Sequence, residues 1–348
     1  MVASFQPVQA VLGGLFIGVG SGVYMYLCRR VAGNSGALKT VILLQFDVGS
    51  ACYLAGLFLG GALVKVTWPD DFETPPPASW RLFVGCVVTG TGVTYAKGCT
   101  SGHGLSGISR FSKRSLVAVP VFMLSAICSA TAMSGSLTLG SPVPLRFTPP
   151  ETLELAATIA CALAVAIAPA VVLSKCSPIA SNRDFEMTSQ EEVEEAGNAK
   201  DLKEVGKEPE RGDFLGKEPY VGLWVGICFG IGLGVGGMAR PSSVIGALSP
   251  VHPDPTLWVL FVTALSLTFI IYRIAEKSGI KEAVAEGGTV DSHLVIGSIL
   301  FGIGWGVTGL CPGPHIVGLG AMPFSPGLWV AFVGIAVGIW CGHLLIHN

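Results

Sequence analysis

Residues 97–107 read KGCTSGHGLSG and interrupt a very apolar chain. Four glycines in eleven residues break a straight helix, and a cysteine, a histidine and hydroxyl side chains lie between them. A related stretch, CPGPHIVGLG, occupies residues 311–320. We expect both stretches to form turns and short helices instead of continuing the apolar segments that precede them.

The two stretches belong to an internal repeat, in which matching residues are separated by one constant offset. Cys99 and His103 recur as Cys311 and His315. Glycines recur at the same offset: Gly14, Gly18, Gly20, Gly22, Gly85, Gly90 and Gly92 match Gly226, Gly230, Gly232, Gly234, Gly297, Gly302 and Gly304. A second, shorter offset occurs inside each half and relates its first Gly-rich run to its second. Each half therefore holds a smaller tandem unit, in which a Gly-rich helix is followed by a motif and another helix.

The composition is that of a membrane protein. The chain has 348 residues, of which 51% are hydrophobic and 13% are charged, and its mean hydropathy is +0.64. Soluble domains are about 25% charged, so polar surface is too scarce here to cover a water-soluble globule. The net charge of −2 gives no basic excess for nucleic acid, and the ten cysteines include no CxxC pair. We expect an all-α integral membrane protein with no nucleic-acid partner, no metal and no cofactor.

Nine apolar runs are long enough to cross a bilayer, which takes about 20 residues. They cover residues 9–28, 40–64, 82–97, 115–133, 152–174, 220–238, 255–272, 293–310 and 326–346. The expected fold is a bundle of about nine transmembrane helices, with short re-entrant helices at the two motifs.

A charged segment, residues 175–219, divides the chain. It is poor in apolar residues and reads as a flexible, partly helical linker. We predict an N-terminal membrane half (1–174), a cytoplasmic linker (175–219) and a C-terminal membrane half (220–348). Five runs precede the linker, and because five is odd the second half enters the membrane in the opposite sense. The halves are then inverted repeats, which in transporters meet at a site near the bilayer midplane.

The positions of lysine and arginine predict the orientation. With the N-terminus outside, the cytoplasmic segments hold 17 of the 21 basic residues, and the outer loops hold Lys65, Arg81, Arg146 and Arg240. Because cytoplasmic loops carry the excess of Lys and Arg, this places the linker and the C-terminus in the cytoplasm. The plasma membrane is the expected location, with membrane lipids as the surroundings.

The two motifs supply candidate substrate-binding residues. The N-terminus of a re-entrant helix offers free backbone N–H groups to an anion, and thiols are soft, polarizable groups that suit a sulfur anion better than a hard cation. The histidines either contact the substrate or hold their loops, and both roles stay open on the sequence alone. The candidates are Cys99, Thr100, Ser101, Gly102, His103 and Gly104 in the first half, and Cys311, Pro312, Gly313 and His315 in the second.

These blocks resemble the YeeE/YedE sulfur-transport family. The stretch KGCTSGHGLSGISRFSKRSLVAVPVFM (97–123) is similar to the signature of that family, and the resemblance covers nearly the whole chain outside the linker and loops. Two second-half blocks, GICFGIGLGVGGMARPSSVIGAL (226–248) and FGIGWGVTGLCPGPHIVGLG (301–320), are similar to it as well.

The resemblance implies an hourglass-like bundle that takes up thiosulfate through a narrow central path. Cysteines along that path would pass the anion on by S–H···S contacts, and Cys99 and Cys311 match two of them. The first cysteine of the family lies at the end of the first Gly-rich span, where Cys28 is the candidate. In many members the two halves resemble separate polypeptides, whereas here the linker joins them.

Other functions remain open on the sequence alone. A carrier for sulfide, persulfide or a selenium compound fits the same motifs. A membrane thiol-redox protein would use Cys99 and Cys311 as a disulfide pair. A soft-metal transporter would normally need clusters of Met or Cys on single helices, which the sequence lacks. We expect no enzyme activity, and the sequence identifies no downstream sulfur-handling partner.

Overall fold

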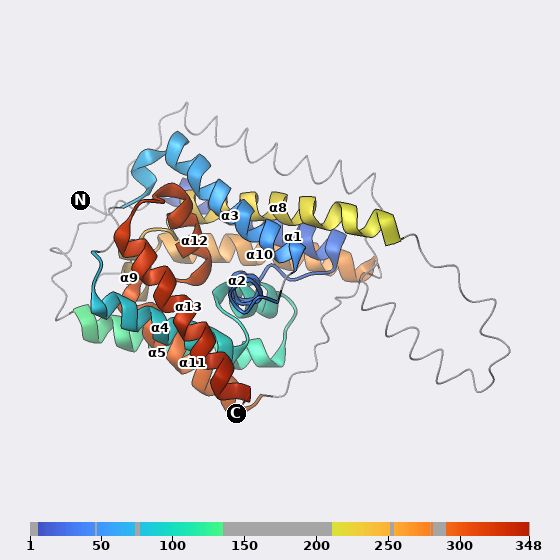
Figure 1. The fold of residues 1–348 in the computed structure, drawn as a ribbon. Helices are drawn as coiled ribbons and strands as arrows, with labels where there is room; N and C mark the ends of the chain where they lie inside the picture. Colours follow the sequence, from blue (N-terminus) through green and yellow to red (C-terminus); the bar gives the residue numbers. More distant parts are fainter. Residues whose placement is uncertain are drawn as a thin grey trace, which may run out of the picture.

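The computed structural model describes residues 6–45, 47–73, 77–134, 211–250, 254–278, 280 and 290–347. The predicted span at 152–174 and most of the predicted linker lie outside these residues. The described residues form helices and the turns that join them (Figure 1), so the all-α prediction is confirmed.

The helices form four units, each with a short helix between two long ones. In chain order they are α1 (Pro7–Cys28), α2 (Asn34–Ile42) and α3 (Val48–Thr67); α4 (Trp80–Ala96), η2 (Thr100–Gly107) and α5 (Lys113–Ser134); α8 (Arg211–Val235), α9 (Pro241–Leu248) and α10 (Thr256–Lys277); and α11 (Ser292–Thr308), α12 (Pro312–Ala321) and α13 (Pro326–His347). A short 3-10 helix, η1 (Pro69–Asp71), follows α3. The predicted tandem unit of helix, motif and helix is confirmed. Helix α8 begins inside the segment that the sequence assigned to the linker.

The second unit of each half matches the other in structure at the same offset that relates the sequences. Helices α4 and α11 have 17 residues each, and the side chains of Ser79 and Asp291 cap their N-termini. Both helices end on a left-handed residue, Lys97 with φ 58° and Gly309 with φ 67°. This conformation terminates the helix and turns the chain into the next short helix.

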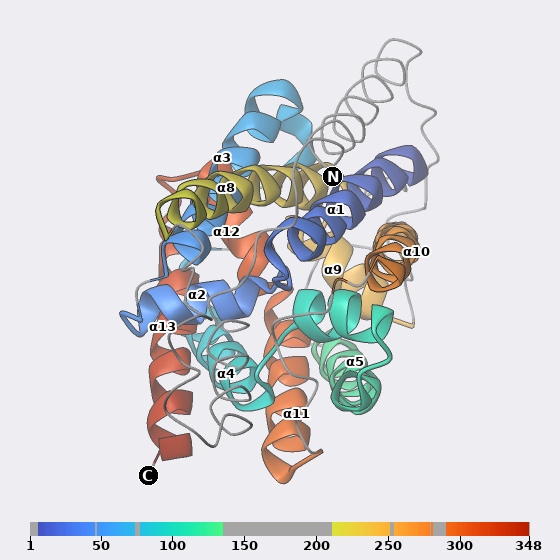
Figure 2. The same ribbon diagram turned by 90° about the vertical axis from the view of Figure 1, so that its right-hand side faces the viewer.

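The eight long helices of the described residues form two rows of four (Figures 1 and 2). One row has the packing order α10, α1, α8, α3 and the other α5, α11, α4, α13. At the centre of the first row, α1 and α8 are antiparallel, because Gly13 lies against Gly232 while Gly20 lies against Phe229. The central pair α4 and α11 is antiparallel in the same way. Since each of these pairs consists of equivalent helices, the halves run in opposite directions, as the inverted-repeat prediction requires.

Glycine allows neighbouring helices within each row to pack backbone against backbone. A Cβ on Gly56 would clash with the Leu223 carbonyl oxygen, and one on Gly90 would clash with the Ile335 carbonyl oxygen. Small residues at such contacts are typical of membrane helices, where close packing replaces the hydrophobic effect as the force between helices.

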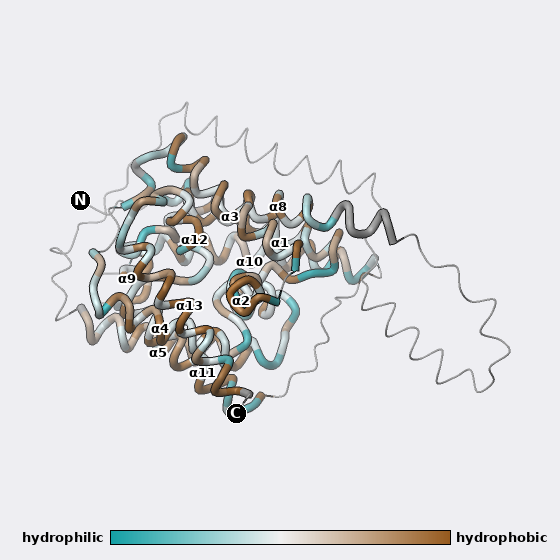
Figure 3. Tube along the Cα trace, viewed as in Figure 1, coloured by the Kyte–Doolittle hydropathy of each residue, from teal (hydrophilic) through white to brown (hydrophobic). Residues whose placement is uncertain are grey.

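The outer surface is apolar. Seven helices of the described residues are long and apolar enough to cross a membrane. Figure 3 shows hydrophilic colour mainly at helix ends and in loops. Large side chains such as Leu63, Leu124 and Ile270 are exposed on the outward faces of long helices. Together these features describe a multi-pass membrane protein.

One predicted span has the wrong boundaries. The run 40–64 is not a single helix, because α2 ends at Ile42 and α3 begins at Val48. Between them Leu44 adopts a left-handed φ of 56°. Asp47 then caps α3 by accepting a hydrogen bond from the backbone N–H of Ser50. The polar cap competes with continued helix, so the apolar run is split.

Polar contacts tie the ends of the α1–α8 pair. At one end Arg30 contacts Glu218 at 2.6 Å and Asp47 at 2.5 Å. Burial opposes ionisation of Asp47, but hydrogen bonds from Arg30 and Ser50 outweigh it and lower its pKa to about 2. At the other end Arg240 donates a 3.3 Å hydrogen bond to the side chain of Gln6. The first end is therefore ionic, whereas the second pairs a cation with a neutral amide.

Candidate functional site

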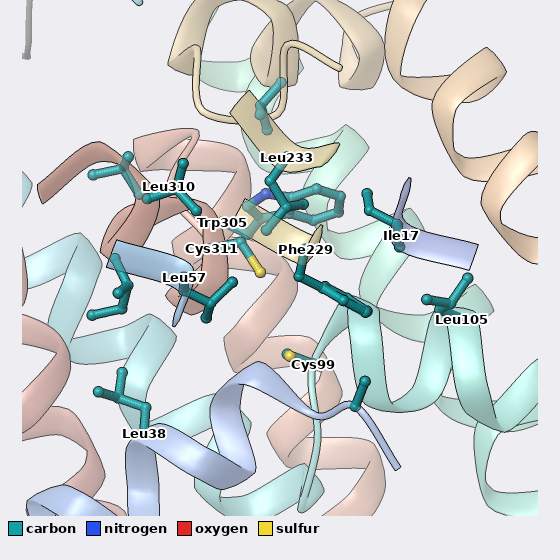
Figure 4. Close-up of a cluster of buried hydrophobic side chains, with 14 of the residues drawn as sticks. Ile17, Leu38, Leu57, Cys99, Leu105, Phe229, Leu233, Trp305, Leu310 and Cys311 are labelled. Atoms are coloured by element: carbon teal, nitrogen blue, oxygen red, sulfur yellow. The ribbon is translucent and has the colours of Figure 1, made fainter. Parts of the chain in front are cut away.

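Cys99 and Cys311 lie in the buried centre of the molecule, where they occupy the N-cap positions of η2 and α12. Their exposed fractions are 0% and 1%. Lys97, only two residues before Cys99, is exposed. Figure 4 shows both sulfur atoms in the same interior region, beside Phe229. The chain thus turns inward at each motif, as predicted, and both cysteines are free thiols.

The two thiols share polar partners across the halves. The Cys99 thiol lies 3.2 Å from the Ser101 hydroxyl, and the Cys311 thiol lies 3.3 Å from the Thr100 hydroxyl. The thiols lie near each other, because Thr100, which contacts the Cys311 thiol, directly follows Cys99 in the chain. Because Thr100 belongs to η2 and Cys311 to α12, the N-termini of these two helices meet at this point. We call the space around the two thiols the neck.

A third helix N-terminus reaches the neck. Helix α2 begins at Asn34, whose backbone N–H donates to the Ser101 hydroxyl at 3.1 Å. The next residue, Ser35, is buried and lies close to the Cys99 thiol. Helix N-termini carry partial positive charge. Three of them converging on one buried point make the neck a favourable place for an anion.

His103 holds its loop. Its Nε2–H donates to the Ala96 carbonyl oxygen at 3.0 Å, which leaves Nδ1 as the acceptor of a 3.0 Å hydrogen bond from the Ser115 hydroxyl. These contacts join the end of α4 to the start of α5. Both ring nitrogens are therefore used within the protein, which favours the loop-holding role of the two that the sequence left open.

His315 differs from its counterpart. It is fully buried, and its ring stacks on Phe332 of α13 with centroids 6.4 Å apart. The Leu328 backbone lies close to the ring, yet neither ring nitrogen makes a hydrogen bond of good geometry to any residue that the structure describes. His315 therefore packs as a buried ring and does not tie its loop to a neighbour.

The remaining predicted residues have distinct positions. Gly102 has open space where a Cβ would lie, while a Cβ on Gly104 would approach Phe261 at 3.1 Å. Pro312 and Gly313 form the first turn of α12. Cys28 is buried at the last residue of α1, near the charges of Arg30 and Glu218. The structure thus brings Cys99 and Cys311 together, whereas Cys28 lies at the C-terminal end of α1, near Arg30.

Two cavities adjoin the neck. The smaller, of about 40 Å³, is lined by Asn34, Thr100, Ser101, Pro314 and apolar side chains. The larger, of about 100 Å³, lies between α5, α9, α10 and α11 and is almost wholly apolar. Both include Thr100 and Met238 in their lining. The cavities therefore meet at Thr100, beside the thiols.

The sequence interpretation missed three residues of this site: Asn34, Ser35 and Met238. A signal for the first two was present, because AGNSG at 32–36 is a small polar stretch a few residues after the first apolar run. In the same way, CTSGHG at 99–104 follows the third apolar run.

Comparison with known proteins follows the same division into halves. Residues 22–128 match a family described as sulphur transport, and residues 220–344 match a family of unknown function. A Xylella fastidiosa protein named "Probable transporter" is 32% identical over 124 residues, which are 35% of this chain and 92% of that protein. A second Xylella fastidiosa "Probable transporter" is 35% identical over 135 residues, or 37% of this chain and 88% of that protein.

Inverted helical repeats, an apolar outer surface and these relatives together define a multi-pass membrane transporter. The chain belongs to the YeeE/YedE-type sulphur-transport family, which confirms the resemblance seen in its motifs. Each relative is matched over nearly its whole length but covers little more than a third of this chain. Two units that are separate proteins elsewhere are joined here.

Proposed function

We propose that the protein imports thiosulfate, or a closely related small sulfur anion, through the neck between Cys99 and Cys311. The observation that carries this proposal is the pair of buried thiols at the N-caps of two short helices, one from each half. The anion would pass between them, with its terminal sulfur accepting S–H···S contacts from one thiol and then the other.

The electrostatics of the neck support this proposal. Moving a dianion out of water is very costly unless polar groups replace its hydration. Helix N-termini and the hydroxyls of Thr100 and Ser101 offset part of that cost. Among the described residues, those that line the two cavities include no carboxylate to repel an anion. Several weak contacts suit passage better than one tight site, because the anion must also leave.

Cys28 would serve as a further contact on the same route. It ends α1 close to Arg30, a residue on the side that the charge distribution assigns to the cytoplasm. A thiol there would receive the anion after it leaves the neck, and the neighbouring Arg30 would attract it electrostatically.

The orientation is part of the proposal: the N-terminus outside, the linker and C-terminus in the cytoplasm, and the plasma membrane as the location. Contacts between segments support it. Arg114 lies 3.8 Å from Asp291, and Arg273 donates a 3.2 Å hydrogen bond to the Ser109 carbonyl. Segments that the positive-inside rule places on one side therefore also meet in space.

Growth tests the proposal. A bacterial strain without its own sulfate and thiosulfate uptake would express the protein with thiosulfate as the only sulfur source. We expect growth with the wild type and little growth with Cys99→Ala or Cys311→Ala. Cys86→Ala is the matched control, because Cys86 is fully buried but lines neither cavity. Equal growth of all four proteins would refute a role for the two neck thiols.

The closeness of the two thiols also favours a second candidate function, a membrane thiol-redox protein. Such a protein would cycle between a Cys99–Cys311 disulfide and two thiols. Uptake measured in excess reductant separates the two functions. A transporter with free thiols keeps its uptake there and loses it when an oxidant crosslinks the pair, whereas a redox protein would show no uptake in either state.

A further inference from the structure

We propose that Asn34 binds the oxygen atoms of the transported anion and so sets the preference for an oxygen-bearing sulfur anion. This inference rests on the proposed function. It concerns a residue of α2, outside both cysteine motifs, that the sequence patterns did not single out. Asn34 is only 3% exposed, and it lines the smaller neck cavity together with Thr100 and Ser101.

The orientation of the Asn34 amide is set by its neighbours. The Tyr53 hydroxyl donates a hydrogen bond to Oδ1 of Asn34. Tyr53 is 1% exposed and stacks on Tyr24, with ring centroids 5.9 Å apart and planes 7° apart. A buried, stacked tyrosine cannot easily move, so it keeps Oδ1 on its own side. The amide nitrogen Nδ2, with its two N–H donors, is left on the opposite side.

Nδ2 lies at the N-terminus of α12. A Cβ on Gly313 would collide with it, so the amide occupies the space that a side chain would take. No residue among those that the structure describes accepts a hydrogen bond from Nδ2. An amide that lines a cavity and has two donors unused by the described residues is suited to hold a ligand there.

The sequence of α12 explains why such a donor is needed. The first turn of an ordinary helix offers several free N–H groups. In α12 the residues Pro312 and Pro314 have no N–H, and the N–H of His315 donates to the Cys311 carbonyl oxygen. The Asn34 amide supplies the donors that the prolines remove.

The two kinds of donor suit the two ends of one anion. Thiols are soft and suit a terminal sulfur, while amide N–H groups suit hard oxygen atoms. Helix α9 takes the place of α2 in the second half, and its first residue is Pro241, which has no side-chain donor. The neck is therefore asymmetric, and the anion would pass with its oxygen atoms toward α2.

Three variants separate binding of the anion from support of the fold, with labelled thiosulfate uptake into proteoliposomes as the assay. Asn34→Ala removes the amide donors and also the hydrogen bond with Tyr53. Tyr53→Phe removes the same hydrogen bond but keeps the donors. The double variant removes both partners, which relieves the unpaired buried hydroxyl that Asn34→Ala alone would leave.

We expect Asn34→Ala and the double variant to raise the KM for thiosulfate about tenfold or more, the size of effect that follows from losing a hydrogen bond to a charged group. Tyr53→Phe should raise it less than about threefold. The double variant should be more thermally stable than Asn34→Ala and yet bind as poorly.

The inference is overturned if Asn34→Ala has the KM of the wild type, or if Tyr53→Phe raises the KM as much as Asn34→Ala does. Asn34→Asp serves as a second variant of nearly the same shape. It removes the donors and adds a negative charge, so we expect no uptake, and normal uptake would also overturn the inference. A wild-type protein that takes up no thiosulfate would instead refute the proposed function.

Discussion

Helices η2 and α12 are equivalent by sequence and position, but they contribute different chemistry to the neck. Helix η2 has hydroxyls after its cysteine, and His103 ties it to α4 and α5. Helix α12 has two prolines and Gly313 after its cysteine, and His315 makes no comparable tie to the residues that the structure describes. The repeat therefore preserves the path of the backbone and the two thiols. The first half supplies most of the polar donors, whereas the second half leaves space beside Gly313, where the Asn34 amide lies.

The first test of this difference between η2 and α12 fills the space beside Gly313. Gly313→Ala would place a methyl group against the Asn34 amide, and overpacking of this kind costs about 1–3 kcal/mol. We expect a lower thermal midpoint and strongly reduced thiosulfate uptake.

Gly318→Ala in the same helix is the control, because its nearest neighbour would lie 3.7 Å away. We expect that change to be neutral or slightly stabilising, since alanine favours helix over glycine. Equal losses from both substitutions would show that α12 tolerates no added side chain anywhere, and the close fit at Gly313 would then have no special meaning.

The second test compares the two histidines. His103→Leu leaves the buried Ser115 hydroxyl and the Ala96 carbonyl without their partner, which costs about 1–3 kcal/mol. His315→Leu removes no such hydrogen bond and replaces a buried polar ring with an apolar side chain. Thermal unfolding in detergent should show a clear loss for the first variant and little or no loss for the second. A larger loss for His315→Leu would contradict the assignment of His103 as the tethered histidine.

The smallest effect is expected where the chain enters η2 and α12. The first half uses Lys97 in a left-handed conformation, where the second half uses Gly309. Lys97→Gly should therefore raise the free energy of unfolding by up to about 1 kcal/mol, because glycine adopts a positive φ without steric strain. A thermal midpoint that falls after this substitution would show that the lysine side chain has a stabilising contact that outweighs the strain.

Much of the architecture could be predicted because the repeat is periodic. Its constant offset paired Cys99 with Cys311 and α4 with α11, and the odd number of apolar runs implied opposite directions for the halves. The break between α2 and α3 was missed, because an apolar run shows no interruption when a single capping residue, Asp47, provides it.

The site was predicted less completely. Asn34 contacts Ser101 from a distant part of the sequence, and the polar stretch AGNSG that contains Asn34 does not show which other segment it meets. The two histidines look alike in their motifs, yet their surroundings differ. Ser115, which donates to His103, is matched in the second half by Gly327, which has no hydroxyl to donate. Side-chain partners on other helices, which the motif itself does not contain, decide what each histidine does.

Uptake of labelled thiosulfate into proteoliposomes, with and without an imposed gradient, tests the central claim most directly. The purified wild type, Cys99→Ala, Cys311→Ala and the Cys86→Ala control would be compared at equal protein density. We expect uptake by the wild type and the control, and a reduction of about tenfold or more in both neck variants, since each loses a donor to a charged ligand. Wild-type uptake that persists in Cys99→Ala and Cys311→Ala would contradict passage of the anion between the two thiols.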